Sequence, residues 1–357
     1  MTTMKILEGT TDAANQSYYA AEGLKALGYD ARCAHYTSCE YFLEGDFEFG
    51  FDRAKRVRYP LYAMRMAAFA YRAAREYDVF HFHCGRSLLP KNLDLGMLDK
   101  KGKGYFFEYH GSEIRQGSHG RENPYSDRIP LYFENDAAVR RAEMQLAHAR
   151  GAIVHDAEMG LYVPRVAPLY YVPLRIDADR FSPNFPDGDA SRRPLVVHAP
   201  SSRSVKGSDV IESVLDELSA SYDFDVRIIH DVPQVEAFEI YRQADIVIDQ
   251  LYIGTYGVFA LEAMALGKPV VTYLRPDLKE AFPKDLPIVS ASEATLKEAL
   301  ASLLENPAEL GRLGRLGRSY VERYHDYLKI AVVLAKLYET GEGPGDPLAA
   351  FAEVARQ

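Results

Sequence analysis

The sequence predicts an α/β fold with two doubly wound, Rossmann-like domains that face each other across a ligand cleft. Strand and helix patterns alternate from the first residues, and the alternation starts again after residues 182–193, which are rich in proline, glycine and acids. Alternation of this kind is typical of parallel sheets covered by helices, which bind ligands beyond the carboxyl ends of their strands. A chain of 357 residues, 47% hydrophobic and 26% charged, is long enough for two such domains.

Composition narrows the class of protein. The net charge of −9 argues against general affinity for nucleic acid, although a local basic face is compatible with it. The cysteines Cys33, Cys39 and Cys84 fit no metal or disulfide spacing, which favours a reducing, cytoplasmic setting. We expect no signal peptide, because the chain enters its first strand without a basic region and an apolar core. The sequence contains no run of about 18 apolar residues, so we expect no membrane-spanning helix.

The amino-terminal half begins with a strand at residues 5–8, a polar turn, and a helix at residues 17–27 that Gly28 ends. A second strand follows at residues 30–36. Because an open α/β sheet binds ligands at the turn after its first strand, we predict that Thr10, Thr11 and Asn15 line the cleft. An ordinary capped turn is an equally simple interpretation of these three residues.

The segment from residue 53 to residue 75 is strongly basic. It contains seven arginines and lysines and no acid, interleaved with tyrosine, phenylalanine and methionine. A basic amphipathic helix of this kind suits an anionic membrane surface or an acceptor that carries a pyrophosphate. The alternative is a solvated helix whose apolar side belongs to the core.

Histidines mark two further strands of this half. His81 and His83 fall on one face of the strand at residues 78–83, and burial or a place at the cleft edge is favoured over metal ligation because no third ligand is in view. The strand at residues 104–109 leads into His110, Glu113 and Arg115, at the sheet edge where such enzymes place active-site groups. A capping cluster is the alternative for these last three residues.

The second half repeats the alternating pattern before it becomes helical. We predict strands at residues 195–199, 226–230, 246–251, 270–274 and 288–289, a loop at 200–207, helices at 209–218 and 234–243, a helical region at 295–339 broken by Pro307, and a last short helix.

The most informative stretch runs from residue 249 to residue 271. After a buried strand, Gly254 and Gly257 predict a tight turn, and a helix starts near Val258 and ends at Gly267. A helix amino terminus at the carboxyl end of a strand presents free N–H groups and a partial positive charge, which suits phosphate. Glu262, one turn into the helix, is placed to accept hydrogen bonds from a ribose diol.

The loop after the first strand of this half supplies two cations. Arg203 and Lys206 are suitable partners for a pyrophosphate at the helix end, because arginine can clamp two oxygens and lysine acts as a point charge. Such a loop is weak evidence alone, but the combination with the glycine turn and helix is much rarer.

Together these motifs resemble the GT-B glycosyltransferases, specifically the retaining family 4 type (glycosyl transferases group 1). The resemblance covers nearly the whole chain and rests on residues 77–83, 109–115, 172–183, 203–207 and 256–270. It implies that Arg203 and Lys206 bind the donor diphosphate, that Glu262 binds the ribose, and that Gly257 and Val258 bind phosphate through their amides. It also implies that Tyr256 lies on the donor side, that His110 lies beside the transferred sugar, and that His110, Arg203 and Lys206 are the catalytic groups.

One position departs from the family pattern. Members usually carry two glutamates with seven residues between them, and the position eight before Glu262 is Gly254. The missing carboxylate would contact the donor sugar, so Asp249 is a candidate to replace it.

The resemblance implies transfer of a sugar from a nucleotide donor to a hydroxyl group with retention, without a metal or other cofactor. We expect a UDP-sugar donor and a glycan or lipid-linked glycan acceptor, and no nucleic acid partner. Residues 1–173 would form the acceptor domain, with Thr10, Thr11, Asn15, Glu113 and Arg115 on that side. Residues 174–325 would bind the nucleotide sugar, and the helices of residues 326–357 would pack back on the first domain. The enzyme would be cytoplasmic, and the inner membrane surface is one place where it could act.

Other classes compete with this interpretation. Gly254 is compatible with a catalytically idle partner subunit, and a sugar-nucleotide epimerase has the same architecture. A GT-A metal transferase is disfavoured because the Asp-x-Asp pairs flank a linker or precede a strand. A nicotinamide enzyme is disfavoured because no Gly-x-Gly-x-x-Gly follows a strand.

Overall fold

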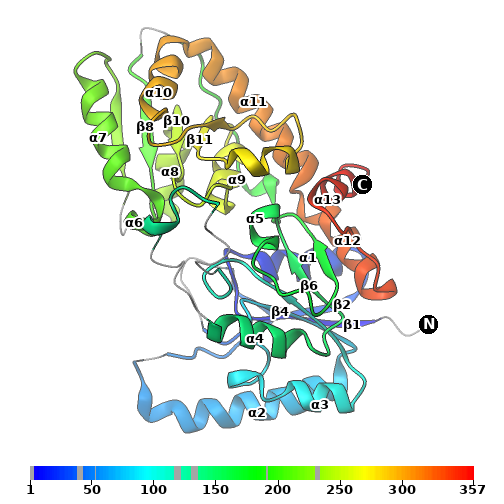
Figure 1. The fold of residues 1–357 in the computed structure, drawn as a ribbon. Helices are drawn as coiled ribbons and strands as arrows, with labels where there is room; N and C mark the ends of the chain where they lie inside the picture. Colours follow the sequence, from blue (N-terminus) through cyan, green and yellow to red (C-terminus); the bar gives the residue numbers. More distant parts are fainter. Residues whose placement is uncertain are drawn as a thin grey trace. The chain divides into compact units, whose positions relative to one another are not determined.

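The computed structural model describes residues 4–37, 43–52, 54–115, 122–129, 136–189, 192–229 and 234–357 (Figure 1). They belong to two compact units, each with its own parallel sheet. Unit 1 comprises Met1–Gln116, Glu134–Arg175 and Tyr327–Gln357, and unit 2 comprises Gly117–Phe133 and Ile176–Asp326. The predicted fold class, two doubly wound α/β domains, is confirmed at the level of these units.

Unit 1 is built on a seven-stranded parallel sheet in the order β3-β2-β1-β4-β5-β6-β7. Successive strands therefore run outwards in both directions from the β1/β4 pair, which makes that pair the topological switch point. The strands are β1 (Lys5–Thr10), β2 (Asp30–His35), β3 (Phe47–Glu48), β4 (Val79–His83), β5 (Gly104–Glu108), β6 (Gly151–Val154) and β7 (Leu169–Tyr171).

The helices of unit 1 come from both ends of the chain. They are α1 (Gln16–Ala26), α2 (Tyr59–Glu76), α3 (Leu95–Lys100), α4 (Asp136–Leu146), α5 (Ala157–Gly160), α12 (Tyr327–Thr340) and α13 (Pro347–Val354), with the short 3-10 turns η1 (Arg56–Arg58) and η2 (Pro90–Asn92).

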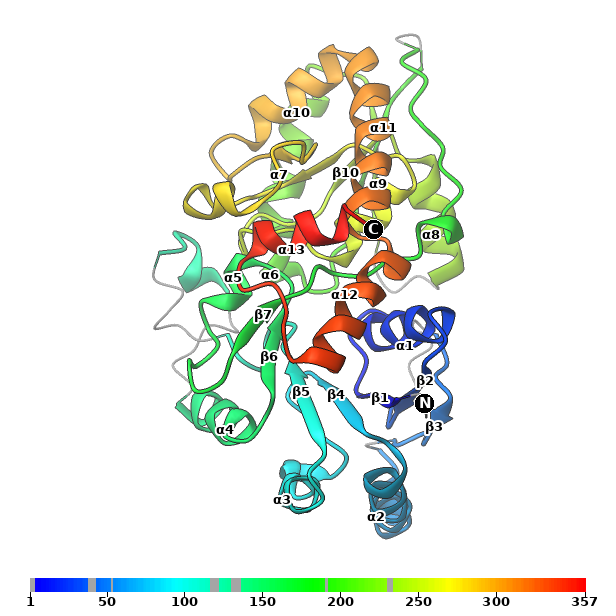
Figure 2. The same ribbon diagram turned by 90° about the vertical axis from the view of Figure 1, so that its right-hand side faces the viewer.

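The core of unit 1 joins the first strand to the last helices. Ile6 of β1, Leu24 of α1 and Phe106 of β5 pack in one buried cluster with Ile330 and Leu334 of α12. Gly23 permits the close approach of α1 and α12, because a Cβ there would lie 2.7 Å from the Cβ of Ala331. Figure 2 shows α12 beside α1, over the strands of this sheet. The carboxyl-terminal segment is thus part of the amino-terminal unit.

Unit 2 contains a five-stranded parallel sheet in the order β12-β11-β10-β8-β9, with its switch point between β8 and β10. The strands are β8 (Leu195–His198), β9 (Asp225–Ile228), β10 (Ile246–Ile248), β11 (Val270–Thr272) and β12 (Val289–Ser290). The helices are α6 (Arg203–Lys206), α7 (Ser208–Ser219), α8 (Gln234–Gln243), α9 (Val258–Ala265), α10 (Leu296–Glu305) and α11 (Pro307–Tyr324), with the turns η3 (Ser126–Arg128), η4 (Ala178–Arg180) and η5 (Pro276–Ala281).

Most predicted elements are present. Several strands, such as β10 and β11, end earlier than predicted, whereas β1 extends beyond the predicted residue 8 to Thr10. The predicted loop at 200–207 is wrong in one respect, because Arg203–Lys206 forms the helical turn α6, which Gly207 ends with a φ of 74°. The expected break at Pro307 is confirmed, since α11 starts there. Within the described parts of the chain, no helix is long and apolar enough to cross a membrane.

Candidate functional site

An ion pair occupies the switch point of unit 2. Asp249 directly follows β10, and its carboxylate binds the ammonium of Lys206, which ends α6 after the neighbouring strand β8. The Asp249 side chain is fully buried and that of Lys206 is 13% exposed. The backbone N–H of Leu251 donates to the Lys206 carbonyl at 3.1 Å, which ties the two loops together. A lysine is therefore held at the edge where such sheets bind ligands.

Arg203 lies on the same short helix but has different partners. Its guanidinium binds Asp209 at 2.8 Å and Glu212 at 2.5 Å, both on the following helix α7. With 40% of its side chain exposed, Arg203 is a surface group held by two acids. A phosphate would have to draw it away from those carboxylates.

The amino terminus of α9 is open. Gly257 is its N-cap residue, with extended φ and ψ of −113° and −171°, and no side chain caps the helix. A Cβ on Gly257 would meet no described atom within 4 Å, apart from its chain neighbours, so there is room beside the backbone at this position. The N–H groups of the first turn, Val258 among them, therefore form a candidate anion site.

Tyr256, just before this helix, is directed into the interior. It is 4% exposed, and its hydroxyl lies 3.1 Å from both the Tyr320 hydroxyl and His325 Nε2. The side chain that was predicted on the donor side thus anchors the residue before the helix, and its hydroxyl is used inside unit 2.

Glu262 is a partly exposed acid with an unusual pKa. Burial raises its pKa from 4.5 to about 7; Arg180 opposes this rise and the charge of Asp249 adds to it. Among the described residues, none forms a hydrogen bond with the Glu262 carboxyl. An acid with this pKa is partly protonated at neutral pH, and it gains its full hydrogen bonds only when a ligand supplies donors or acceptors.

Gly254 cannot be replaced by a larger residue on this backbone. Its φ is +89°, and a Cβ would lie 2.2 Å from Cγ of Arg275. The Arg275 guanidinium, which is fully buried, binds Asp277 at 2.7 Å. The glutamate that the family pattern expects here is therefore excluded by packing. Asp249, its predicted substitute, has one carboxylate oxygen on Lys206 and the other without a hydrogen bond to any described group.

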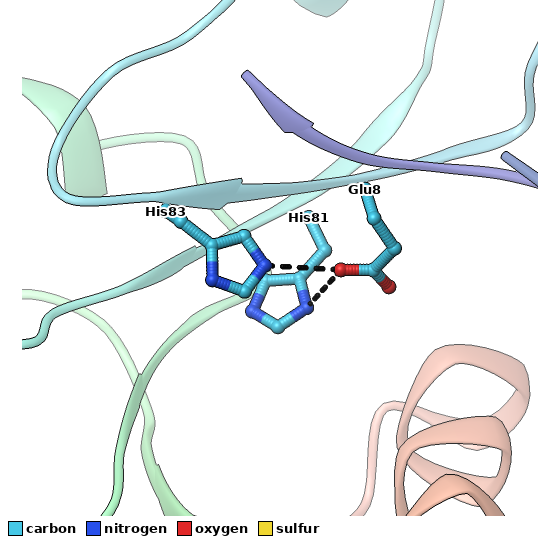
Figure 3. A group of neighbouring side chains, drawn as sticks. All are labelled: Glu8, His81 and His83. Carbon is cyan, nitrogen blue, oxygen red and sulfur yellow. Dashed lines mark hydrogen bonds and ion pairs between the residues drawn. The ribbon is translucent and has the colours of Figure 1, made fainter. Parts of the chain in front are cut away.

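Unit 1 contains a second polar site, which is fully buried. Glu8 of β1 pairs in register with His81 of β4, and His83 pairs with Glu108 of β5. In Figure 3 one carboxylate oxygen of Glu8 faces both imidazoles, at 2.9 Å from His81 Nδ1 and 3.1 Å from His83 Nε2. His81 Nε2 lies 3.1 Å from Glu108 Oε2. The expectation that the two histidines lack a third potential ligand is thus wrong, since Glu8 reaches both.

The charges of this cluster balance. Burial alone would lower the pKa of His81, but Glu8 and Glu108 raise it to about 9. Burial would raise the pKa of Glu8, but His81 and His83 lower it to about 2. Arg175 binds Glu108 and holds its pKa well below the usual range, against burial. Two carboxylates thus face two cations, which is the condition under which buried charges are tolerated.

Two triads in this cluster have the donor set of a metal site. They are Glu8, His81 and His83, and His83, Glu108 and His110. In the protein as it stands, the proton of His81 and the guanidinium of Arg175 already neutralise the carboxylates. Among the described residues, His81 Nε2 and two guanidinium nitrogens of Arg175 are buried without a hydrogen-bond partner.

His110 lies at the rim of this cluster. Its Nε2 is 3.0 Å from His83 Nδ1, and burial holds the pKa of His110 well below its ordinary value, so the ring is neutral. Glu113 accepts a hydrogen bond from the backbone N–H of His110 at 2.5 Å, which fixes the turn after β5. A neutral imidazole of this kind can donate or accept one hydrogen bond.

The other predicted acceptor residues divide into two groups. Arg115 is buried and binds Glu158 through Nη2 at 2.8 Å, so its charge is used within the fold. Asn15, with a φ of 65°, accepts a hydrogen bond from Leu43 N at 2.7 Å and shapes the turn before α1. Thr10 and Thr11, by contrast, line a cavity of about 520 Å³ in unit 1.

The groups that sequence reasoning missed are charges placed inside strands. Glu8 and Glu108 stand in otherwise apolar runs, which is a signal for a buried functional or structural pair. Their partners could not be foreseen, because they depend on strand order and register.

Two parallel doubly wound units, each with polar groups at its switch point, define the GT-B class of fold. Comparisons with known proteins agree. Residues 202–335 match the family model described as glycosyl transferase-like. A curated D-inositol 3-phosphate glycosyltransferase from Nocardia farcinica is 28% identical over 189 residues, which are 52% of this chain. The match spans 40% of the length of that relative.

Solved structures show the same fold over most of the chain. The sucrose-phosphate synthase of Thermosynechococcus elongatus has a TM-score of 0.62 at 16% identity, covering 94% of this chain and 98% of that one. HepE of Anabaena in complex with UDP and glucose has a TM-score of 0.62 at 12% identity, covering 94% and 100%. The chain therefore has the GT-B glycosyltransferase fold, and residues 202–335 are similar in sequence to glycosyltransferases.

Proposed function

We propose that the protein is a glycosyltransferase that moves a sugar from a nucleoside diphosphate donor, preferably a UDP-sugar, to a hydroxyl of a glycan or lipid-linked glycan. In this proposal unit 2 binds the donor and unit 1 receives the acceptor. Support for UDP comes from similar folds, since HepE of Anabaena has been solved with UDP and glucose and with UDP-glucose.

One observation carries the donor site: Lys206, the open amino terminus of α9 and Glu262 all belong to the loops and helix that follow β8 and β10. The lysine and the helix terminus are the positive groups that a diphosphate requires. Glu262, whose carboxyl has no hydrogen bond of its own among described residues, suits the ribose hydroxyls. Arg203 would join the diphosphate by leaving Asp209 and Glu212.

The chemistry follows from these charges. As the bond between the sugar and the diphosphate breaks, negative charge grows on the leaving oxygens, and preorganised N–H groups and Lys206 stabilise it. In this proposal these groups neutralise the diphosphate without a metal. Neutral His110 would contribute one hydrogen bond beside the transferred sugar, and the product would keep the anomeric configuration of the donor.

The helix terminus can be tested with little disturbance of the fold. Val258 is the first residue of α9, a position where proline is favoured, and Gly257 already has the extended backbone that precedes proline. Val258→Pro removes one backbone N–H group, whereas Val258→Ala shortens the side chain and keeps the N–H group. We expect Val258→Pro to weaken UDP binding by about tenfold or more, as for the loss of a hydrogen bond to a charged group.

Isothermal titration calorimetry with UDP and uridine separates the possible outcomes. Uridine lacks the diphosphate, so its affinity should be equal in the two variants. Equal UDP affinity in the proline and alanine variants would contradict the assignment of the helix terminus to the donor site. Failure of the unmodified protein to bind any nucleoside diphosphate would overturn the donor proposal as a whole. Retention is checked by NMR of the anomer first released from a UDP-sugar.

A second candidate function is that of a catalytically idle partner subunit. It is favoured by the packing of Arg275 against Gly254, which excludes the expected glutamate. Nucleotide binding without turnover over a broad panel of donors and acceptors would support it.

We also propose that helix α2 contacts the inner, anionic membrane surface. Met64 of α2 is 64% exposed, and Leu61 and Tyr71 of the same helix are exposed beside the arginines of residues 56–75. Val57, in the turn η1 just before the helix, is 96% exposed. Exposed apolar groups flanked by cations suit such a surface. Sedimentation with vesicles that contain phosphatidylglycerol should carry the protein down, and Met64→Asp should reduce the bound fraction more than Arg140→Asp on α4.

A further inference from the structure

The cavity of unit 1 lies at the switch point of its sheet. Thr10 ends β1, Tyr36 follows β2, and Gly85 to Asn92 follow β4 on the other side. Arg141 and Met144 of α4 complete the lining. Its volume, about 520 Å³, falls in the range of about 300–1,000 Å³ that is usual for small-molecule sites.

The described charges at this cavity have one sign. Arg86, Lys91 and Arg141 line it, and no aspartate or glutamate appears among the described residues of the lining. All three side chains are exposed, and none forms an ion pair with a described residue. In a chain with a net charge of −9, three cations that have no ion-pair partner among the described residues favour an anionic ligand at this cavity.

The neutral polar groups of the lining are largely used within the protein. Thr10 donates to the carbonyl of Ser87 at 3.0 Å, and the Tyr36 hydroxyl donates to that of Leu88. Asn92 accepts from the N–H of Ser87 at 2.9 Å. Such a site offers few partners for the many hydroxyls of an uncharged sugar.

Apart from Thr11, Thr37 and Gly85, the rest of the lining is apolar. Phe51, Met66, Leu89, Pro90 and Met144 contribute to it. Met66 comes from α2 and Met144 from α4, so two different helices supply apolar side chains to the cavity. Methionine adapts its shape to flexible apolar chains. The cavity thus combines cations with an apolar interior.

The loop that carries two of the cations is held in a fixed conformation. Cys84, Lys91 and Asn92 have positive φ angles of 55°, 58° and 58°, which non-glycine residues rarely adopt. Buried Asp94 accepts hydrogen bonds from Ser87 Oγ at 2.6 Å and from the N–H of Leu89 at 2.9 Å. Conformations of this kind persist where surrounding contacts enforce them, often at ligand sites.

From these observations we infer that the cavity binds an anionic amphiphile, a molecule whose phosphate lies among Arg86, Lys91 and Arg141 and whose apolar part fills the space between α2 and α4. The inference deepens the proposed function, on which it rests, by naming the acceptor class: a glycan that is linked to a lipid through phosphate.

Binding of monomeric octyl phosphate, measured by calorimetry without nucleotide, tests the cavity directly. We expect octyl phosphate to bind at least tenfold more tightly than inorganic phosphate, which lacks the chain, or octyl glucoside, which lacks the charge. Arg141→Gln should weaken octyl phosphate binding about tenfold, and Arg140→Gln, an equal change of charge on the same helix, should leave it unchanged. Met144 is exposed, and Met144→Gln should weaken the binding of octyl phosphate and leave the binding of inorganic phosphate unchanged.

Each contrary result has a definite meaning. Equal affinity for inorganic phosphate and octyl phosphate would identify a soluble phosphate ligand and overturn the amphiphile. Equal effects of the two arginine variants would show nonspecific charge attraction and overturn the site. If the protein binds octyl phosphate but no nucleoside diphosphate, the site is supported and the proposed transferase function is overturned. If the protein turns over a nucleotide sugar but does not bind octyl phosphate, the transferase function is supported and the site is overturned.

Discussion

Replacing Glu262 by glutamine should stabilise the protein, and increasingly so as the pH rises. The carboxyl has a pKa of about 7 in the folded chain against 4.5 for an ordinary glutamate. Because the folded-state pKa is raised, the protonated acid is favoured by folding. That contribution is fully present below pH 4.5 and is lost as the pH rises through about 7. The difference between the folded and unfolded pKa values lowers the free energy of unfolding by about 3 kcal/mol at alkaline pH, at about 1.36 kcal/mol per pKa unit.

Glutamine has nearly the same shape and no charge, so it avoids this cost. Glu262→Gln should raise the free energy of unfolding by up to about 3 kcal/mol at pH 8.5 and by about 1 kcal/mol at pH 5.5. Urea denaturation at both pH values measures the difference. Glu298→Gln, an exposed change on α10, serves as the control and should shift stability equally at both pH values. A gain at pH 8.5 no larger than at pH 5.5 would refute the burial of an ionising carboxyl at this position.

Other substitutions test the turn before α9 and the buried cluster of unit 1. Gly254→Ala should cost about 1–3 kcal/mol in urea denaturation, because of its positive φ and the contact with Arg275, whereas Gly257→Ala should change stability by less than about 1 kcal/mol. An equal cost at both glycines would contradict this account. Glu8→Gln should lower the free energy of unfolding by about 3–5 kcal/mol at pH 7, since it leaves buried His81 without its main counter-charge. The unmodified protein should lose stability as the pH rises from 7 through 9, because His81 has a raised pKa of about 9 and its stabilising charge disappears. Retention of the imidazolium NMR signal well above pH 9 would point to a stronger pairing.

Much of the fold follows from local patterns in the sequence. The alternation of strands and helices, the stop at Gly267 and the restart at Pro307 depend on neighbouring residues, and the structure contains all three. The open start of α9 was predictable for the same reason, since glycine precedes a strongly apolar helix.

The candidate site was less predictable because its pairs are distant in sequence. Lys206 meets Asp249, and Glu8 meets His81, only through the order of the strands. The sequence motif 110–115 suggested Glu113 and Arg115 as acceptor-side groups, but Arg115 forms an ion pair with buried Glu158. A cation in a motif can be assigned to a ligand only when its protein partners are known.

The packing of α12 against α1 has a consequence for the synthesis of the chain. Residues 327–357 belong to unit 1, so its hydrophobic core and the hydrogen bond from Tyr338 to Glu8 at 2.9 Å cannot be complete until α12 and α13 have left the ribosome. At typical translation rates they follow Arg175 by on the order of ten seconds. During that interval unit 2, which is continuous over Ile176–Asp326 apart from its short early segment, can complete its own sheet. The unit synthesised first is therefore the one that finishes folding last.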